Sequence, residues 1–275
     1  MITLENVSKT YAGSGRVIRA LTRLRLEVET GEWLAVMGPS GAGKSTMLRL
    51  IAGLETPDSG IVCVGGGFRG EGGSAEGGVG MLFQDHPLFP HLTVRENLEF
   101  GLRRRRLPAA ARETRVVEVA EMLRVTALLG RMPDELSGGE RRRVALGSVL
   151  AFRPRVLLLD EPLGSLDGTL RLEVRDELHG LRRGLPGTTV VVVTHDPLEA
   201  MALGDRVALI EFGELRQVGT PAELYHRPAH VSVASATGRM PLNRLAGECV
   251  LEEGRVLFRA AGGLSVRVPR TVPET

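Results

Sequence analysis

The chain has 275 residues, enough for one large domain, or one domain with a small appendage, around a full hydrophobic core. Its formal net charge of +2, in a chain that is 25% charged, gives no general case for nucleic acid or an anionic membrane surface as a partner. The two cysteines, Cys63 and Cys249, lie far apart without a CxxC spacing, which argues against a disulfide framework and a zinc site.

The N-terminal residues lack the apolar centre of a signal peptide, and no run approaches the roughly 18 apolar residues of a membrane span. We therefore expect a protein that is cytoplasmic or peripheral on the cytoplasmic face of the membrane. In the first third, a helix is predicted to begin near Lys44, and the glycine-rich segment 65–78 is predicted to be a flexible loop. Strands are predicted at residues 2–7, 24–28, 32–38, 61–66 and 79–84.

From Val94 to about Phe152 the pattern is mainly helical. Apolar runs then predict short strands, separated after the first by a helical stretch at about 168–183. Strand, helix, strand order with continuous apolar strands predicts an α/β fold with a largely parallel sheet covered on both faces. After about Ser235 short alternating runs predict a small β appendage. The later strands are predicted at residues 156–162, 188–195 and 206–212.

The stretch GPSGAGKST fits the pattern G-x-x-x-x-G-K-[ST] between a predicted strand and a predicted helix. Gly38, Gly41 and Gly43 allow backbone N–H groups to converge on phosphate oxygens at a helix N-terminus. Lys44 is one of two lysines among the 35 lysines and arginines. A compact ammonium reaches the β- and γ-phosphates where a planar guanidinium is bulkier, and Ser45 offers a hydroxyl to Mg²⁺. This context favours a phosphate-binding loop over an ordinary glycine turn.

The run VLLLDEP predicts the acidic partner of this loop, because an apolar strand ends there in two acids. Asp160 is placed to hold the Mg²⁺ shell, and Glu161 to orient or deprotonate an attacking water. Alone, the run is also consistent with a buried strand that ends in a solvated acid pair. Its combination with the glycine loop favours the functional interpretation.

LSGGE at 136–140 resembles the signature of ATP-binding cassette (ABC) ATPases. The family's other motifs match in order at Tyr11, at Gln84, at LGSLD (163–167) and at His195. The resemblance covers roughly residues 1–235 and implies a P-loop NTPase core sheet with a helical subdomain at about 85–155. Residues 236–275 resemble the start of an importer's C-terminal OB-like domain.

The resemblance also implies the role of each motif residue. Tyr11 would stack on adenine, Glu161 would be the general base, and His195 would touch the γ-phosphate. Gln84 would contact both metal and water, so Mg²⁺ would be held by Ser45, Gln84 and Asp160. The residues that would hold ATP are Tyr11, Gly38, Pro39, Ser40, Gly41, Ala42, Gly43, Lys44, Ser45 and Thr46, with Ser137, Gly138 and Gly139 completing the site of the opposite copy.

The resemblance therefore implies a second cassette, either this chain again or a close relative, with Asp167 at the interface. LFPHLTV after Gln84 resembles importers, in which a groove accepts a helix from a separate transmembrane permease subunit. Leu88, Phe89, Leu92 and Phe100 would form this partly exposed surface. A small core of the helical subdomain itself is the alternative. A solute-binding protein would be an indirect partner, and the chain would lie on the cytoplasmic face of the membrane.

The cargo hints disagree. GRMPLNRLAGE is similar to carbohydrate importers, whereas Phe89 is more usual in importers of iron, polyamine and molybdate. We favour carbohydrate and leave inorganic ions, iron and polyamines open. The arginine runs at 103–106 and 141–143 are interpreted as solvated helix faces, with no nucleic-acid partner. A soluble ATP-dependent nucleic-acid clamp is the rival from another class.

The sequence departs from the family pattern in three places. The appendage is shorter than a full β domain. Gly147 and Ser148 stand where the family usually has alanine and arginine, and glycine in a helix costs about 1 kcal/mol relative to alanine. The segment 65–78 is glycine-rich where the family usually has charge. Because none of these touches the acid pair or Lys44, we expect activity, with a subunit that only binds ATP as an alternative.

Overall fold

The computed structural model describes residues 1–13, 16–69, 78–85, 87–104, 107–162, 180, 182, 184–238, 242–252, 255–260 and 262–268. It divides into two compact units, Met1–Thr237 and Gly238–Thr275. The helical stretch predicted at 168–183 lies almost entirely outside the described residues, and so does Asp167.

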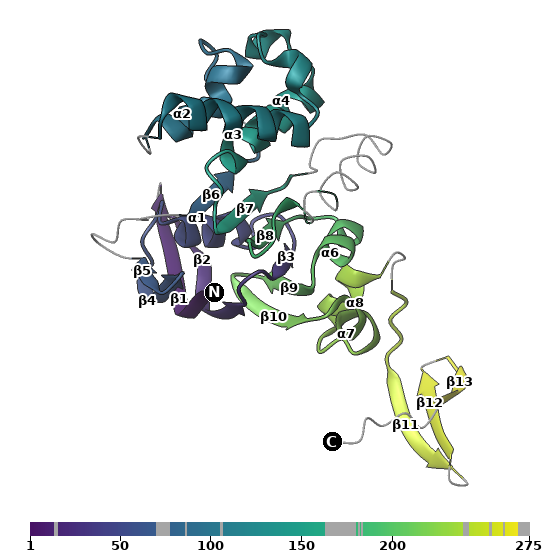
Figure 1. Cartoon of the computed structure of the whole chain (residues 1–275). Coiled ribbons are helices and arrows are strands. Elements are labelled where there is room, and N and C mark those ends of the chain that lie inside the picture. The colour runs from purple at the N-terminus through teal and green to yellow at the C-terminus, as the bar shows by residue number, and fades with distance from the viewer. Residues whose placement is uncertain are drawn as a thin grey trace. The chain divides into compact units, whose positions relative to one another are not determined.

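The first unit is built on two sheets (Figure 1). The larger sheet has the strand order β10-β9-β3-β8-β7-β6, in which only β10 runs antiparallel to its neighbour. The smaller sheet, β2-β1-β4-β5, is antiparallel throughout. The larger sheet consists of β3 (Trp33–Met37), β6 (Val79–Leu82), β7 (Val156–Asp160), β8 (Thr189–Val193), β9 (Arg206–Glu211) and β10 (Glu214–Gly219). The smaller consists of β1 (Ile2–Gly13), β2 (Arg16–Val28), β4 (Ser59–Val64) and β5 (Gly67–Arg69).

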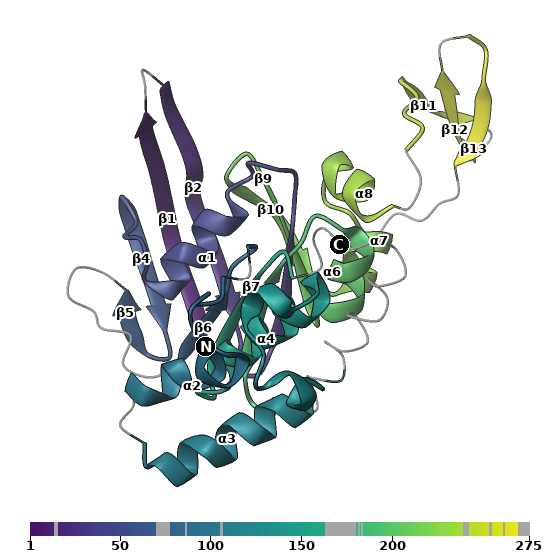
Figure 2. The ribbon, with the colours of Figure 1, turned by 90° about the horizontal axis from the view of Figure 1, so that it is seen from above.

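Side chains alternate between the two faces of the larger sheet, as the period of a strand requires. On β7, Leu158 packs toward the smaller sheet and α1 (Lys44–Ala52), while Leu157 and Leu159 pack toward the helical subdomain. All five residues of β7 are buried, which explains the continuous apolar run. Figure 2 shows α1 beside both sheets. The prediction of a largely parallel α/β sheet covered on both faces is confirmed.

Helices complete the first unit. The helical subdomain contains α2 (Val94–Arg104), α3 (Ala109–Met122), two 3-10 turns (Thr126–Leu128 and Pro133–Glu135) and α4 (Gly138–Leu150). Three shorter helices, α6 (Pro197–Leu203), α7 (Pro221–His226) and α8 (Val231–Thr237), follow later in the chain. Leu224 and Val233 on α7 and α8 pack with Ala35 of β3 in a third core cluster. No helix in the described part of the chain is long and apolar enough to span a bilayer.

The structure corrects the expected loop at 65–78 in part. Residues 67–69 form β5, in which Gly67 pairs with Val64 and Arg69 with Val62. Residues 70–77 lie outside the described residues. A short edge strand can form here because backbone pairing needs no large side chains.

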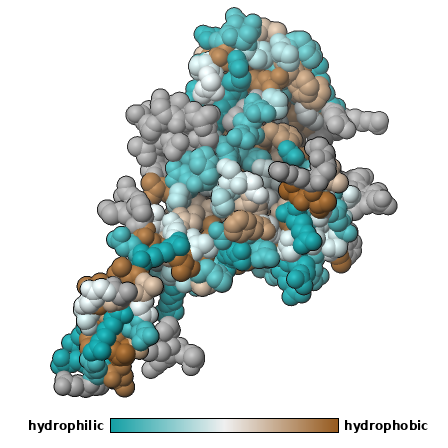
Figure 3. Space-filling model, turned by 180° about the vertical axis from the view of Figure 1, so that it is seen from behind, coloured by the Kyte–Doolittle hydropathy of each residue, from teal (hydrophilic) through white to brown (hydrophobic). Residues whose placement is uncertain are grey.

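The second unit is a small antiparallel sheet of three strands, β11 (Gly247–Glu252), β12 (Arg255–Ala260) and β13 (Ser265–Val268). Three strands with an apolar face are better able to hold together than an isolated hairpin. Figure 3 shows one face of the molecule, on which apolar residues (brown) form separate areas among hydrophilic ones (teal).

Candidate active site

The glycine-rich loop joins β3 to α1 at the edge where the parallel strands end. Gly38 has φ +152°, and a Cβ there would lie 2.0 Å from the carbonyl oxygen of Ile210 on β9. Gly43 has φ +98°, and a Cβ there would lie 2.2 Å from the carbonyl oxygen of Ala20 on β2. Only glycine fits at these two positions, because the loop passes directly against the backbone of both sheets.

Lys44 turns its side chain back over the loop. Its Nζ donates to the carbonyl oxygens of Gly38 at 2.7 Å and Pro39 at 2.9 Å. Burial lowers the pKa of Lys44, although the carboxylates of Glu161 and Asp160 oppose this shift. An ammonium has three N–H donors, so the loop holds this cation in place with a donor left for a ligand.

The acid pair stands at the end of β7, beside the loop. Ser45 Oγ donates to Asp160 Oδ1 at 3.1 Å. Burial raises the pKa of Asp160 and the neighbouring Glu161 adds to this, while the hydrogen bond from Ser45 opposes it. A cation bound to Asp160 would favour the ionised carboxylate and so oppose the effect of burial on its pKa. Within the described ranges no three His, Cys, Asp or Glu side chains cluster as a metal site.

These residues fit Mg²⁺. A hydroxyl and a carboxylate are hard oxygen donors, and Mg²⁺ usually takes one or two protein ligands together with phosphate oxygens and water. A site with few protein carboxylates is therefore what a magnesium–nucleotide complex requires. Gln84 could contribute a third oxygen, although in this structure its amide nitrogen faces Glu161.

Glu161 has an unusual backbone conformation, with φ +47°. A non-glycine residue in the left-handed region is uncommon and is concentrated at functional sites. Its N–H donates to the carbonyl of Val193, 2.9 Å away, at the end of β8. Its carboxylate accepts from Gln84 Nε2 at 3.2 Å and lies 3.5 Å from His195 Nδ1.

The sheet order explains why these three side chains meet. Gln84, Glu161 and His195 follow β6, β7 and β8, which are adjacent and parallel. The carboxyl ends of parallel strands share one edge, where α/β proteins bind their ligands. Residues more than 30 positions apart in the sequence are thereby brought to one place.

A cavity of about 530 Å³ lies over this edge. Its lining includes Tyr11 and Ile18, which are paired across β1 and β2. The cavity is lined by Tyr11, Ile18, Ala20, Ser40, Gly41, Ala42, Gly43, Lys44, Ser45, Thr46, Gln84, Glu161 and His195. The site predicted from sequence is thus largely collected around one cavity of a size suited to a nucleotide.

Ser137, Gly138 and Gly139 do not line this cavity. They start α4, where Ser137 is the N-cap, and Ser137 and Glu140 bond each other's backbone N–H groups at 3.3 and 2.8 Å. A Cβ on Gly138 or Gly139 would have no atom within 4 Å. The helix start is therefore open to another molecule.

Asn97 on α2 is a structural residue that the sequence analysis missed. It is 2% exposed, and its Oδ1 accepts from the N–H of Phe89 at 2.9 Å. Its Nδ2 donates to the carbonyls of Phe89, Leu92 and Thr93 at 3.2, 2.9 and 3.0 Å. The sequence gives no signal for these contacts, because an asparagine within a helical pattern does not show which backbone groups it meets. Asn97 thus ties both ends of residues 89–93 to α2.

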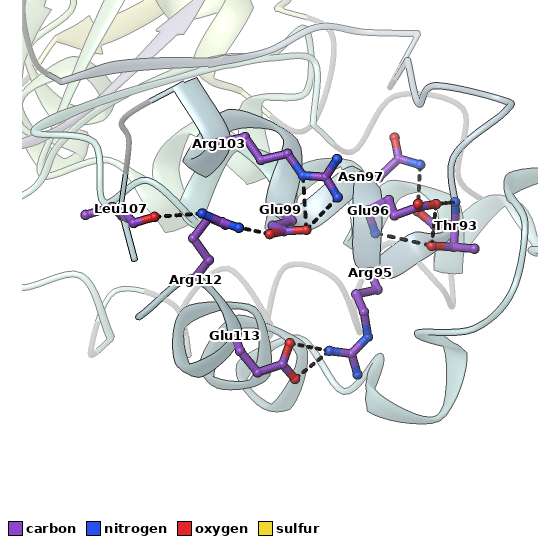
Figure 4. Close-up of polar contacts among 9 residues, drawn as sticks. All are labelled: Thr93, Arg95, Glu96, Asn97, Glu99, Arg103, Leu107, Arg112 and Glu113. Atoms are coloured by element: carbon purple, nitrogen blue, oxygen red, sulfur yellow. Dashed lines mark hydrogen bonds and ion pairs between the residues drawn. The ribbon is translucent and has the colours of Figure 1, made fainter. Parts of the chain in front are cut away.

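Figure 4 shows the polar contacts that α2, which follows this segment, makes at its start and with α3. Thr93 and Glu96 cap α2, and Arg95 pairs with Glu113 on α3. Glu99 accepts from Arg103, which belongs to the RRRR run, and from Arg112 on α3. Both arginines therefore form ion pairs within the helical subdomain. Of the expected surface residues, Phe89 and Phe100 are each 41% exposed with ring centroids 4.2 Å apart, and Leu88 and Leu92 are half-buried.

The departure at Gly147 has a packing reason. A Cβ at Gly147 would lie 2.6 Å from Leu98 Cδ2 on α2 and 3.0 Å from Leu123 Cδ1. The glycine lets α4 approach these leucines closely, which offsets its low helix propensity. Ser148 donates from Oγ to the carbonyl of Ala145 at 2.7 Å, within the helix. Both changes lie away from the cavity.

The loop between β3 and α1, together with the acids at the end of β7, defines a nucleotide-binding protein of the P-loop class. Comparison with known proteins narrows this class. A family model for ABC transporters matches residues 21–164. The chain belongs to the ABC transporter family, as an ATPase that binds ATP.

Two relatives illustrate the similarity. The sn-glycerol-3-phosphate import ATP-binding protein of Brucella abortus is 42% identical over 269 residues, which is 97% of this chain and 76% of that protein. The trehalose/maltose import ATP-binding protein of Thermococcus litoralis is 44% identical over 247 residues, or 88% of this chain and 66% of that protein. A dimeric ATP-binding cassette, solved in a post-hydrolysis state with ADP and Pi, is similar with a TM-score of 0.72 and 33% identity, over 80% of this chain and 98% of that one.

Proposed function

We propose that this chain is the ATP-hydrolysing subunit of a membrane importer for solutes of the carbohydrate class. The observation that supports this most directly is the cavity lined by Lys44, Ser45 and Glu161, with Asp160 bonded to Ser45 beside it. Two relatives support a carbohydrate cargo, because they are named as import ATP-binding proteins for sn-glycerol 3-phosphate and for trehalose and maltose.

The residues of the cavity suggest how hydrolysis proceeds. The loop N–H groups and Lys44 bind the phosphates, and the ring of Tyr11 stacks on adenine. Glu161 accepts the proton of the attacking water, while Gln84 and His195 hold its carboxylate at the γ-phosphate end. Mg²⁺, held by Ser45 and Asp160, would supply neutralisation of the phosphate charge. Glu161, with its left-handed backbone, lines the cavity.

A second cassette completes the site. Ser137, Gly138 and Gly139 are open and outside their own cavity, which suits them to the ATP of an opposing copy. The similar cassette solved as a dimer supports this pairing. The partner is a second copy of this chain or a close relative.

Separate transmembrane permease subunits are the proposed partners at the helical subdomain, on the cytoplasmic face of the membrane. Phe89 and Phe100 offer a partly exposed aromatic pair, in which Asn97 holds the segment that carries Phe89 and α2 carries Phe100. A solute-binding protein would deliver cargo to the permease. We further propose that the second unit is the start of an OB-like domain.

Uptake in cells tests this proposal. In bacteria that lack the ATP-binding subunit of an sn-glycerol-3-phosphate or a trehalose/maltose importer, expression of this chain should restore uptake of the labelled solute. Glu161→Gln should not restore it, which controls for expression. Failure in both strains, together with retention of DNA or RNA on the purified protein in a salt-sensitive assay, would instead support the nucleic-acid clamp.

A further inference from the structure

The second lysine of the chain lies beside the same cavity. Lys9 is on β1, two residues before Tyr11, and its side chain is 16% exposed. Its Nζ lies over the ring of Tyr11, 5.7 Å from the centroid, within the range of a cation–π interaction. The same Nζ donates to the carbonyl of Thr56 at 2.8 Å and to Asp58 Oδ1 at 3.4 Å.

These partners belong to residues 54–58, which follow α1 and hence the phosphate loop. Glu55 in this 54–58 segment accepts a short hydrogen bond from the hydroxyl of Tyr11. Glu55 also pairs with Arg49 on α1 at 3.5 Å. The hydroxyl of Tyr11 lies 3.5 Å from Thr46 Oγ1, in the first turn of that helix. The tyrosine is thus bonded to the helix that starts at the phosphate loop.

The backbone of β1 is attached to the 54–58 segment independently of the tyrosine. Asp58 Oδ2 accepts from the N–H of Thr10 at 2.6 Å, and the Asp58 N–H donates to the carbonyl of Ser8 at 2.9 Å. These two bonds join the segment to the strand without any side chain of Tyr11, Lys9 or Glu55. The contacts of Tyr11 with Lys9 and Glu55 are therefore additional to this attachment of the strand.

We propose that Lys9 and Glu55 are positioning residues that hold the Tyr11 ring at the base-binding end of the cavity, at a fixed distance from the phosphate loop. This inference rests on the proposed function, in which Tyr11 stacks on adenine. A ring already held in place loses less rotamer freedom when the base arrives, so ATP binds more tightly. Burial, and then the bond to Glu55, raise the pKa of Tyr11, so the hydroxyl keeps the proton that it donates.

The inference is tested with two probes on the full chain, Mg-ATP and Mg-tripolyphosphate, which has no base. Tyr11→Phe keeps the ring and removes the hydroxyl, and Glu55→Gln removes the charge that the hydroxyl meets. Each should raise the Kd for ATP by about three- to tenfold, as loss of a charge-assisted hydrogen bond would. The Kd for tripolyphosphate should not change. Lys9→Met should act in the same direction.

The double variant should bind ATP no more weakly than the weaker of the two single variants, because both remove one bond. Glu214→Gln is the matched control, since it removes a carboxylate that pairs with Arg216 on β10. It should leave both affinities unchanged.

Three results would overturn the inference. Unchanged ATP affinity in Tyr11→Phe and Glu55→Gln, with weaker binding in Tyr11→Ala, would remove the positioning role and leave stacking intact. Equal weakening of ATP and tripolyphosphate would mean that the contacts support the loop rather than the base. Unchanged ATP affinity in Tyr11→Ala would remove the proposed role of Tyr11 itself.

Discussion

At the scale of single residues, the chain separates groups that bind ligand from groups that hold structure. Lys44 and Glu161 face the cavity, and each has an unusual setting: a buried ammonium and a left-handed backbone. Asn97 is also buried, but its side-chain hydrogen bonds go to the backbone of residues 89–93. Sequence motifs identify the first kind, because the motif residues have fixed spacing. They do not identify the second.

The role of Asn97 leads to a prediction. Asn97→Ala should destabilise the first unit by about 1–3 kcal/mol, because partly buried backbone groups of Phe89, Leu92 and Thr93 lose their partner. The variant should also lose solute uptake more than ATP binding, since Phe89 is no longer held. Urea unfolding measures the first effect. Asn243→Ala, at an exposed position, is the control, and equal stability of the two variants would contradict the prediction.

At the scale of elements, capping decides where the short helices begin. Thr220 and Glu223 cap α7 reciprocally: Glu223 Oε2 accepts from the Thr220 N–H at 2.7 Å, and Thr220 Oγ1 accepts from the Glu223 N–H at 3.3 Å. Thr93 and Glu96 cap α2 in the same way. Because a six-residue helix has little stability of its own, the cap and the packing of Leu224 define it.

The cap of α7 predicts a dependence on pH. The hydrogen bond from the backbone of Thr220, followed by that from its hydroxyl, lowers the pKa of Glu223 from 4.5. The ionised form therefore stabilises the folded state above pH 4.5, and this contribution is lost as the pH falls through the lower folded pKa. Glu223→Gln keeps the shape of the cap but cannot titrate.

Urea midpoints should therefore differ between wild type and Glu223→Gln at pH 7, with the wild type more stable, and converge as the pH falls below 4.5. Glu248→Gln, on the exposed face of β11, should show no such difference at either pH. A gap that stays constant with pH would contradict the assignment of this carboxylate to the cap.

Elements with a strong apolar pattern were predictable from the sequence, and weakly patterned ones were not. β3, β7 and β8 are buried at every position and appeared as continuous apolar runs. β10 has the polar sequence ELRQVG and mostly half-buried residues, so its pairing with β9 was not predicted. β5 lies in a glycine-rich segment and depends on β4 for its existence.

At the scale of the whole molecule, the site depends on strand order. The sequence predicted which residues would meet because their motifs match a family, and the order β8-β7-β6 supplies the physical reason. It could not predict the bond of Tyr11 to Glu55 or those of Lys9 to Thr56 and Asp58, because these join β1 to a loop more than 40 residues away. Such contacts arise only when two sheets pack on one helix. The family resemblance predicted the residues of the site, and only the folded structure shows the contacts that hold them in place.

ATP hydrolysis by the purified chain, compared with Glu161→Gln, tests the central claim most directly. The wild type should hydrolyse ATP with Mg²⁺ and stop when the metal is chelated. In Glu161→Gln the hydrolysis rate should fall by about 10²- to 10⁴-fold, because a general base contributes that much. This variant should also accumulate an ATP-bound dimer, detected by size-exclusion chromatography. A variant that hydrolyses ATP as fast as the wild type would contradict the account, and so would a wild type that binds ATP without turnover.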